Sequence, residues 1–290
     1  MSPHPVCWYA VLSVFSFLLG ACVGSFLNVC IYRIPRDIAL HDPNRSFCPN
    51  CKTKIAWYDN IPLLSFFLLR RKCRHCGAPI SPRYVLVEFL VGLLFLLVWL
   101  KLDLIGHRAL GLVPVNDWRL VLVYWLAISG LVLGTFVDLE HLIIPDRVTL
   151  GGIAAGLVLS PLVPTLHSAS GRLEALLLSA SGAALGWLLL WSVAFLGRLA
   201  FRKEAMGFGD VKLMGAIGAL LGWRAVLFTI IISAFAGSIV GVTLVLLGRK
   251  QLQSRIPYGP YLALAATLWI LWGPQWWQAY VNLLLPPSLP

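Results

Sequence analysis

Four cysteines in two close pairs are the residues of this 290-residue chain best suited to binding a metal ion. Cys48 and Cys51 form the motif CPNC, Cys73 and Cys76 form CRHC, and 21 residues separate the pairs. Each Cys-x-x-Cys turn presents two sulfurs, and four thiolates complete the tetrahedral coordination of Zn²⁺. Because such a set leaves no position for a catalytic water, the spacing predicts a structural zinc site.

The alternatives for these cysteines are two disulfides or four free thiols. Disulfides are rare in the reducing cytoplasm, where the charge distribution described below places this segment. The segment, residues 33–83, is also too short to build a large apolar core, and domains of that size commonly need a metal. We therefore predict a small zinc-ribbon-like insert.

Two aspartates form a second group of residues suited to catalysis, because each stands at the end of an apolar stretch. Asp138 lies in GTFVDLEHLIIPD and Asp210 lies in MGFGDVKL. A carboxylate at the edge of a membrane span is costly and commonly functional. If the two carboxyls approach within about 3–5 Å, one stays protonated while the other is ionised. Such a pair can activate a water and protonate a leaving amine, which indicates peptide-bond hydrolysis without a metal.

Each acidic residue also has a structural interpretation. Asp210 can cap a helix beside Lys212, and Asp138 can be a solvated span end. Asp146 follows a proline and precedes an apolar stretch, so we expect it to be a helix N-cap rather than a catalytic group. Glu88, one turn inside the second apolar stretch, can pair with a nearby arginine or contact substrate, and the sequence does not choose between these.

The elements that must position these residues are membrane helices. Hydrophobic residues make up 59% of the chain, charged residues 12%, and the mean hydropathy is +0.83, values typical of a polytopic membrane protein. The net charge of +11 is confined to short segments between apolar stretches, which argues against nucleic-acid binding. Apolar stretches near the length of a bilayer span cover residues 6–30, 84–100, 120–137, 148–166, 175–197, 226–247 and 259–280.

One further apolar stretch, residues 211–221, is too short for a full span. A helix of about eleven residues rises roughly 16 Å, against a hydrocarbon core of about 30 Å. We count it as an eighth, short crossing that the surrounding protein must support. The sequence thus predicts an all-α polytopic membrane protein with about eight transmembrane helices.

The basic residues indicate how these spans are oriented. With eight crossings, segments 33–83, 138–147, 198–212 and 248–257 share one side and hold 18 of the 23 Lys and Arg residues. By the positive-inside rule that side is the cytoplasm, and both termini lie outside. The insert and both aspartates then face the cytoplasm.

Glycines four residues apart recur within the spans and predict closely packed helices. The pairs are Gly20/Gly24, Gly130/Gly134, Gly152/Gly156, Gly182/Gly186, Gly218/Gly222 and Gly237/Gly241.

Five motifs in order along the chain carry a resemblance to a known family. They are GSFLNVCIYRIP (24–35), the two cysteine pairs, DLEHLIIPD (138–146), MGFGDVKL (206–213) and IPYGPYLALA (256–265). Together they resemble the prepilin peptidases, bifunctional type IV leader peptidases and N-methyltransferases of the GxGD aspartic protease class. The resemblance covers nearly the whole chain and implies three parts: a first span (1–32), a zinc-binding insert (33–83) and a protease core (84–290).

The resemblance also implies the activity. Asp138 and Asp210 would be the catalytic pair, and the substrate would be a type IV prepilin or a type II secretion pseudopilin. Its short basic leader would be cleaved after glycine at the cytoplasmic face of the bacterial inner membrane. The new N-terminal residue would then be methylated from S-adenosylmethionine, and membrane lipid would surround the protein.

The methyl-donor site is less well marked in the sequence. No GxGxxG follows a strand and opens a helix, so a Rossmann-type methyltransferase domain is excluded. Positioning of the donor and the amine can suffice for methyl transfer. We expect the site near Asn28, Tyr32 and Arg33, which adjoin the insert.

Two other classes of protein compete with the protease. A transporter or proton relay also uses intramembrane carboxylates and a short crossing, but its site lies near the midplane and its halves repeat. A zinc-ribbon scaffold would explain the cysteines and leave the aspartates without a role. Asp→Asn substitutions separate these classes, because a scaffold tolerates a change that removes a transferable proton.

Overall fold

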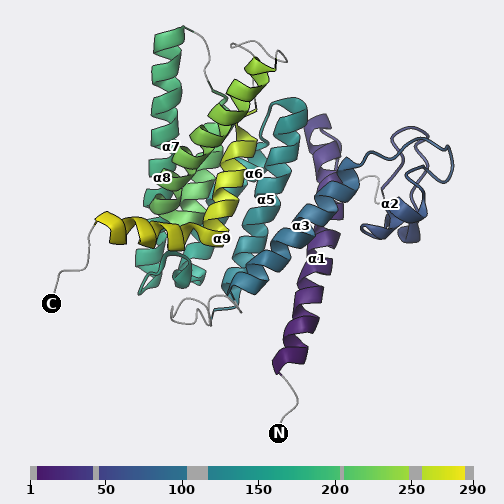
Figure 1. Ribbon diagram of the computed structural model, residues 1–290, viewed down its shortest axis with the longest axis horizontal. Helices are drawn as coiled ribbons and strands as arrows, with labels where there is room; N and C mark the ends of the chain where they lie inside the picture. Colours follow the sequence, from purple (N-terminus) through teal and green to yellow (C-terminus); the bar gives the residue numbers. More distant parts are fainter. Residues whose placement is uncertain (1–4, 42–45, 103–116, 203–205, 248–256, 285–290) are drawn as a thin grey trace. The chain divides into compact units, whose positions relative to one another are not determined.

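The computed structural model describes residues 5–41, 46–102, 117–202, 206–247 and 257–284. Within these residues the chain is helical and has no β-strand, only two isolated bridges in the insert. The α-helices (Figure 1) are α1 (Pro5–Arg33), α2 (Leu64–Leu68), α3 (Arg83–Leu100), α5 (Arg119–His141), α6 (Asp146–Leu162), α7 (Arg172–Phe201), α8 (Phe208–Leu246) and α9 (Gly259–Leu284).

Every apolar stretch predicted from the sequence lies largely within one of these helices, which confirms the all-α class. The short crossing 211–221 and the stretch 226–247 are the two arms of α8. Gly222 separates the arms, because its backbone (φ 81°, ψ 173°) is not helical. Among the described residues, five helical segments are long and apolar enough to cross a membrane: Ala10–Arg36, Arg83–Leu100, Arg119–His141, Arg172–Ala200 and Phe208–Leu246. The basic segment 248–256, which the charge argument includes, lies outside the described residues.

The chain forms two compact units. One comprises residues 1–116 and 124–133, and the other comprises 117–123 and 134–290. The first unit holds α1, α3, the insert and part of α5, and the second holds the remaining helices. The three-part division expected from the sequence stays a prediction.

In the first unit, α1 and α3 pack with their backbones close together, and α3 crosses α1 in Figure 1. A Cβ atom on Gly20 would lie 2.8 Å from the Cα of Gly92, and one on Gly24 would lie 2.7 Å from the Cα of Glu88. Real Cβ atoms essentially never approach other atoms so closely. The predicted close packing at this glycine pair is therefore confirmed.

In the second unit, α6 and α7 both pack closely on α8. A Cβ on Gly152 would lie 2.9 Å from the Cβ of Ala216, and one on Gly156 would lie 2.6 Å from that of Ala219. On the α7 side, a Cβ on Gly182 would collide with the carbonyl of Gly218. At Gly134 and Gly237, by contrast, the nearest atoms are 3.5 and 3.6 Å away, which is ordinary contact.

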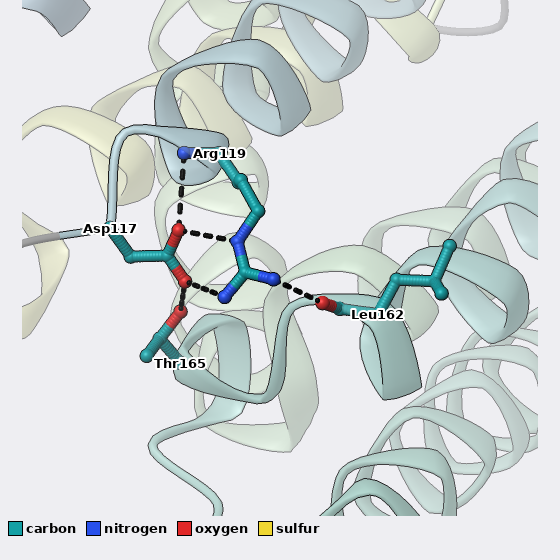
Figure 2. A network of polar contacts seen from close by, with 4 residues as sticks. All are labelled: Asp117, Arg119, Leu162 and Thr165. Atoms are coloured by element: carbon teal, nitrogen blue, oxygen red, sulfur yellow. Dashed lines mark hydrogen bonds and ion pairs between the residues drawn. The ribbon is translucent and has the colours of Figure 1, made fainter.

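A polar network ties the start of α5 to the end of α6 (Figure 2). Arg119 donates to Asp117 from Nε at 2.7 Å and from Nη2 at 2.8 Å, and its Nη1 donates to the Leu162 carbonyl at 3.0 Å. The Thr165 hydroxyl adds a 2.7 Å hydrogen bond to Asp117. The Leu162 carbonyl is one of the groups that a helix end leaves without an intrahelical partner, and Arg119 satisfies it.

His167, in the 3₁₀ turn Pro164–His167, lies at the break in α8. Its Nε2 is 2.9 Å from the Ser160 hydroxyl, and its Nδ1 would be 3.2 Å from a Cβ on Gly222. The Ser179 hydroxyl donates to the Ala219 carbonyl at 2.7 Å. Polar side chains thus compensate for backbone bonds that the break removes.

Candidate active site and metal centre

Asp138 lies in the last turn of α5, and its side chain is 5% exposed. Its Oδ2 accepts a hydrogen bond from the amide of Gly259, the first residue of α9, at 3.1 Å. A Cβ on Gly259 would lie 2.8 Å from the same oxygen, so only glycine lets the amide come this close.

Asp210 lies in the first turn of α8 and is 7% exposed. Gly207 is the residue that precedes the helix, and a Cβ there would lie 3.4 Å from Oδ2 of Asp210. The position agrees with the general preference for negative charge at a helix N-terminus. Gly207, not Asp210, occupies the N-cap position, so the capping interpretation of Asp210 is wrong.

The two aspartates occupy one site. Their carboxyls are close enough for their charges to interact. Ile144, which is 8% exposed, lies beside Gly209, the neighbour of Asp210, and beside Gly259, the hydrogen-bond donor to Asp138. A Cβ on Gly209 would lie 3.3 Å from the Cβ of Ile144, and a Cβ on Gly259 would lie 2.9 Å from its Cδ1. Among the described residues, no ion pair involves either carboxylate, so each keeps oxygen atoms for a substrate or a water.

Tyr258 and Ser233 are site residues to which the sequence analysis gave no role. The Tyr258 hydroxyl lies 2.7 Å from the Ser233 hydroxyl, and the charge of Asp210 reaches Tyr258. Tyr258 and Gly259 belong to the motif IPYGPYLALA, which marked them without indicating what they contact. Ser233 and Ile144 carry no signal of their own, because both residue types are common in membrane helices.

Asp146 is not an N-cap, contrary to our expectation. Pro145 occupies the capping position, and Asp146 is the first residue of α6. Its Oδ1 forms an ion pair with Nζ of Lys212 at 2.7 Å, and its side chain is 60% exposed. This exposure separates Asp146 from the two buried aspartates. The ion pair joins the N-terminal turns of α6 and α8.

The four cysteines form one cluster in the insert. Their sulfurs all lie within 4.8 Å of one another, and the cysteines are free. The Sγ atoms of Cys48 and Cys76 are 3.8 Å apart. This distance matches the sulfur–sulfur edge of a tetrahedron with metal–sulfur bonds of about 2.3 Å. It is much longer than the sulfur–sulfur bond of a disulfide, about 2.05 Å. The disulfide alternative is therefore wrong, and the cluster fits a metal ion.

Each cysteine pair is held by the same backbone turn. The amide of Lys52 donates to the Cys48 carbonyl at 2.9 Å, and the amide of Gly77 donates to the Cys73 carbonyl at 2.9 Å. The amides of Cys48 and Cys73 in turn donate to carbonyls just beyond each pair. Two equivalent knuckles thus orient two sulfurs each toward the other pair.

The environment of the thiols favours metal binding at three of them. A hydrogen bond with the Thr53 hydroxyl lowers the pKa of Cys51, and backbone amides lower the pKa of Cys73 and of Cys76. Burial raises the pKa of Cys48 to about 11. Because the thiolate is the ligand, a bound cation must provide the free energy to deprotonate Cys48.

A cavity of about 440 Å³ lies in the first unit between the insert and the ends of α1 and α3. Its lining includes Asn28, Tyr32 and Arg33, the three residues that we expected near the methyl donor. Asn28 is 2% exposed and donates from Nδ2 to the Tyr84 carbonyl at 3.0 Å. In the part of the chain that the structure describes, its buried Oδ1 has no hydrogen-bond partner.

Glu88 lines the same cavity and joins the insert to α3. Its Oε2 accepts a hydrogen bond from the amide of Leu63 at 2.7 Å, and Ser25 of α1 is a second partner. These contacts give Glu88 a structural task that the sequence did not reveal.

The structure combines helices able to cross a membrane, a buried aspartate pair at helix ends and a four-cysteine cluster. These features define a membrane protein whose aspartate pair is suited to aspartic protease chemistry. Residues 18–102 match the bacterial peptidase A24 N-terminal domain, and residues 125–242 match the type IV leader peptidase family. This chain belongs to the type IV leader peptidase family.

Relatives from several bacteria align with most of the chain. A protein of Aeromonas hydrophila is 36% identical over 283 residues, which cover 89% of each chain. One of Myxococcus xanthus is 42% identical over 81% of this chain and 64% of its own, and one of Pseudomonas aeruginosa is 32% identical over 97% and 96%. All three bear the name prepilin leader peptidase/N-methyltransferase. No solved structure matches the chain.

Proposed function

We propose that this protein removes the leader peptide of type IV prepilins or type II secretion pseudopilins and methylates the new N-terminus. The relatives' name gives both activities. The observation that carries the proposal is the burial of Asp138 and Asp210 at one site, within reach of each other's charge. Asp138 and Asp210 are the catalytic residues in this proposal.

The two carboxyls share one proton and act on opposite sides of the scissile amide. The ionised carboxylate takes a proton from a water, whose oxygen attacks the carbonyl carbon to form a tetrahedral intermediate. The protonated carboxyl donates its proton to the leaving nitrogen as the C–N bond breaks. The products are a free carboxyl on the leader and a free amine on the mature protein, and the shared proton is restored to the pair.

Gly259 restricts where the shared proton can reside. Because its amide donates to Oδ2 of Asp138, the shared proton is less favourable on that oxygen than on Oδ1. Of the two oxygens of Asp138, Oδ1 is therefore the preferred one for exchanging protons with water or with Asp210. The amide also fixes the carboxyl plane before substrate binds, which is the preorganisation that acid–base catalysis needs.

Substrate access follows from where the aspartates stand along their helices. Asp138 lies one turn from the end of α5, and Asp210 lies in the first turn of α8. A substrate whose hydrophobic helix lies in the membrane presents its leader junction at that depth. The excess of Lys and Arg in the same segments supports a cytoplasmic site, with both termini outside the bacterial inner membrane.

The four-cysteine cluster would hold Zn²⁺ as a structural ion. Four thiolates close its coordination sphere, so the ion organises the insert and takes no part in hydrolysis. Cys48 and Cys73 also line the cavity that contains Asn28. The metal therefore shapes one wall of that cavity.

The cavity that Asn28 lines would bind S-adenosylmethionine, the methyl donor. A volume of about 440 Å³ lies within the usual range for small-ligand sites. The unpaired Oδ1 of Asn28 can accept from the adenine amino group, and the ring of Tyr32 can contact the positively charged sulfur. When bound, the donor supplies an electrophilic methyl group for the free amine. Arg33 is 3% exposed and donates to the carbonyls of Ala39 and Leu40, so it holds the wall of the cavity.

The test incubates the purified chain in lipid with a short prepilin, with and without S-adenosylmethionine, and follows leader removal and methylation by mass. Asp138→Asn and Asp210→Asn should each lower cleavage by at least about 10²-fold, the scale of general acid–base catalysis. Asp146→Asn is the matched control and should retain cleavage, because that carboxylate is exposed and paired with Lys212. Full cleavage by the first two variants would sink the aspartic protease assignment.

The donor site has its own test. Asn28→Ala should weaken binding of labelled S-adenosylmethionine while the zinc content and leader cleavage stay unchanged. Unchanged binding of the label would rule out this cavity as the donor site.

A further inference from the structure

Helix α2 presents an apolar face that no described residue of the insert covers. Leu64 is 59% exposed, Phe67 64% and Leu68 74%. These residues have the i, i+3, i+4 spacing of one helix face, whereas Phe66 is only 8% exposed and lines the cavity of the first unit. We call Leu64, Phe67 and Leu68 the outer face of α2.

The 3₁₀ turn Trp57–Asn60 extends this apolar surface. Ser65 of α2 donates to the Tyr58 carbonyl at 3.4 Å, which places the turn beside the helix. Trp57 is 77% exposed, although tryptophan seldom lies this open on the surface of a soluble segment. An exposed patch of this kind marks a surface that contacts something else.

The depth of α2 follows from its contact with α3. The amide of Leu63, the residue before α2, donates to Oε2 of Glu88 at 2.7 Å. Glu88 lies five residues inside α3, which begins at Arg83, and five residues of helix span about 7.5 Å. On α1, a Cβ on Gly24 would lie 2.7 Å from the Cα of Glu88. Because helical side chains lean toward the N-terminus, the Glu88 carboxyl lies near the level of the first turn of α3. Helix α2 therefore begins beside that turn rather than beyond the helix end.

The length of α3 sets where the membrane surface must be. Its 18 residues span about 27 Å, close to the hydrocarbon thickness of about 30 Å. The N-terminus of α3 therefore lies at the edge of the hydrocarbon, and its first turn lies in the interfacial region. Exposed leucine and phenylalanine side chains at that level are suited to contact lipid.

A basic turn follows α2 directly. Arg70, Arg71 and Lys72 are all exposed. The amides of Arg70 and Arg71 donate back to the carbonyls of Phe67 and Phe66 at 3.0 Å each, so the turn stays against the helix. A cationic cluster beside an apolar helix face is the pattern of segments that lie in the interface of anionic membranes.

We propose that the outer face of α2 inserts into the interfacial region of the bilayer, with the basic turn on anionic phospholipid headgroups. The insert is then fixed at the membrane by three attachments: the ends of α1 and α3 and the outer face of α2. This anchoring holds two features at one depth, the cavity lined by Asn28 and the cysteine cluster. At that depth a membrane-embedded substrate would expose its N-terminus.

The experiment places the photoreactive amino acid p-benzoylphenylalanine at position 67 or 68 of the full chain in nanodiscs. One set contains phosphatidylcholine alone, and the other contains added phosphatidylglycerol. Position 54 is the matched control, because Lys54 is also an exposed residue of the insert. Zinc content reports that each variant keeps a folded insert.

Phospholipid adducts at positions 67 and 68, with few at position 54, are expected, and phosphatidylglycerol should raise their yield. Replacing the basic turn by Arg70→Gln, Arg71→Gln and Lys72→Gln should abolish that increase. Equal adduct yields at all three positions, or adducts to a second protein chain in place of lipid, would overturn the proposal. An increase with phosphatidylglycerol that survives the triple substitution would overturn the assignment of the basic turn.

Discussion

The amide of Gly259 donates a 3.1 Å hydrogen bond to Oδ2 of Asp138, and the two residues are 121 positions apart in the chain. The contact joins the start of α9 to the end of α5 and leaves no space for a side chain at position 259. It explains why a glycine stands in the YGP sequence, and it gives the aspartate pair a neutral donor in place of a cation.

Gly259→Ala should therefore lower leader cleavage strongly. The new Cβ would lie 2.8 Å from Oδ2 of Asp138 and 2.9 Å from Cδ1 of Ile144, so the carboxyl must move. Displacement of a catalytic group by about 1 Å costs on the order of 10²-fold in rate. Gly151→Ala is the control, because a Cβ on Gly151 meets nothing within 4 Å. Cleavage of a prepilin peptide measures both, and an unimpaired Gly259→Ala variant would contradict the role of this contact.

Gly222→Ala should destabilise the protein by about 1–3 kcal/mol, the cost of forcing a residue with a side chain into a conformation that glycine alone favours. The backbone at Gly222 has φ 81° and ψ 173°, and a Cβ would also lie 3.2 Å from Nδ1 of His167. The midpoint of thermal unfolding in detergent measures the effect. A midpoint equal to that of the parent protein would mean that α8 can pass position 222 without this break.

Acidification should release the network in Figure 2. The Arg119 guanidinium beside Asp117 holds the pKa of that carboxyl below its usual range. A carboxyl whose pKa is lowered by folding stabilises the protein above its unfolded value of about 3.9, and this contribution is lost as pH falls through the folded pKa.

The parent protein and Asp117→Asn should thus differ in thermal midpoint at neutral pH, and the difference should begin to shrink near pH 4 and disappear as pH falls through the lower folded pKa. Because Arg119 is about half exposed and solvent screens the pair, the difference at neutral pH should be modest. A difference that does not shrink at all between pH 5 and pH 3 would show that the carboxylate charge is not its source.

Removal of the metal should impair methylation more than cleavage. Cys48 and Cys73 line the cavity proposed for the methyl donor, whereas the aspartate pair lies in the other compact unit. Cys73→Ser should lose bound zinc, measured by atomic emission, and should lose methylation while part of the cleavage remains. Cleavage lost to the degree expected for Asp210→Asn would contradict the expectation that the metal acts mainly on the methylation cavity.

Local patterns in the sequence predicted the features that depend on neighbouring residues. Apolar stretches predicted the helices, because a membrane span is a local property of composition and length. Two Cys-x-x-Cys turns predicted the cluster, since each turn fixes two sulfurs within four residues. Small residues four apart predicted the close packing of α1 on α3 and of α6 and α7 on α8, because helix geometry places them on one face.

Other features depend on contacts between distant residues, and the sequence could not supply them. Asp146 looked like a helix cap, and only the folded chain brings Lys212 to its carboxylate. Glu88 had two equal interpretations until the amide of Leu63 was found beside it.

The difference has one physical reason. Residue types and short spacings fix the local chemistry. The sequence by itself therefore determined the membrane helices, the cysteine cluster and which carboxyls lie at the ends of membrane spans. Only the tertiary structure decided which helix ends meet, because hydrogen bonds such as that between Gly259 and Asp138 join residues whose separation in the chain carries no pattern.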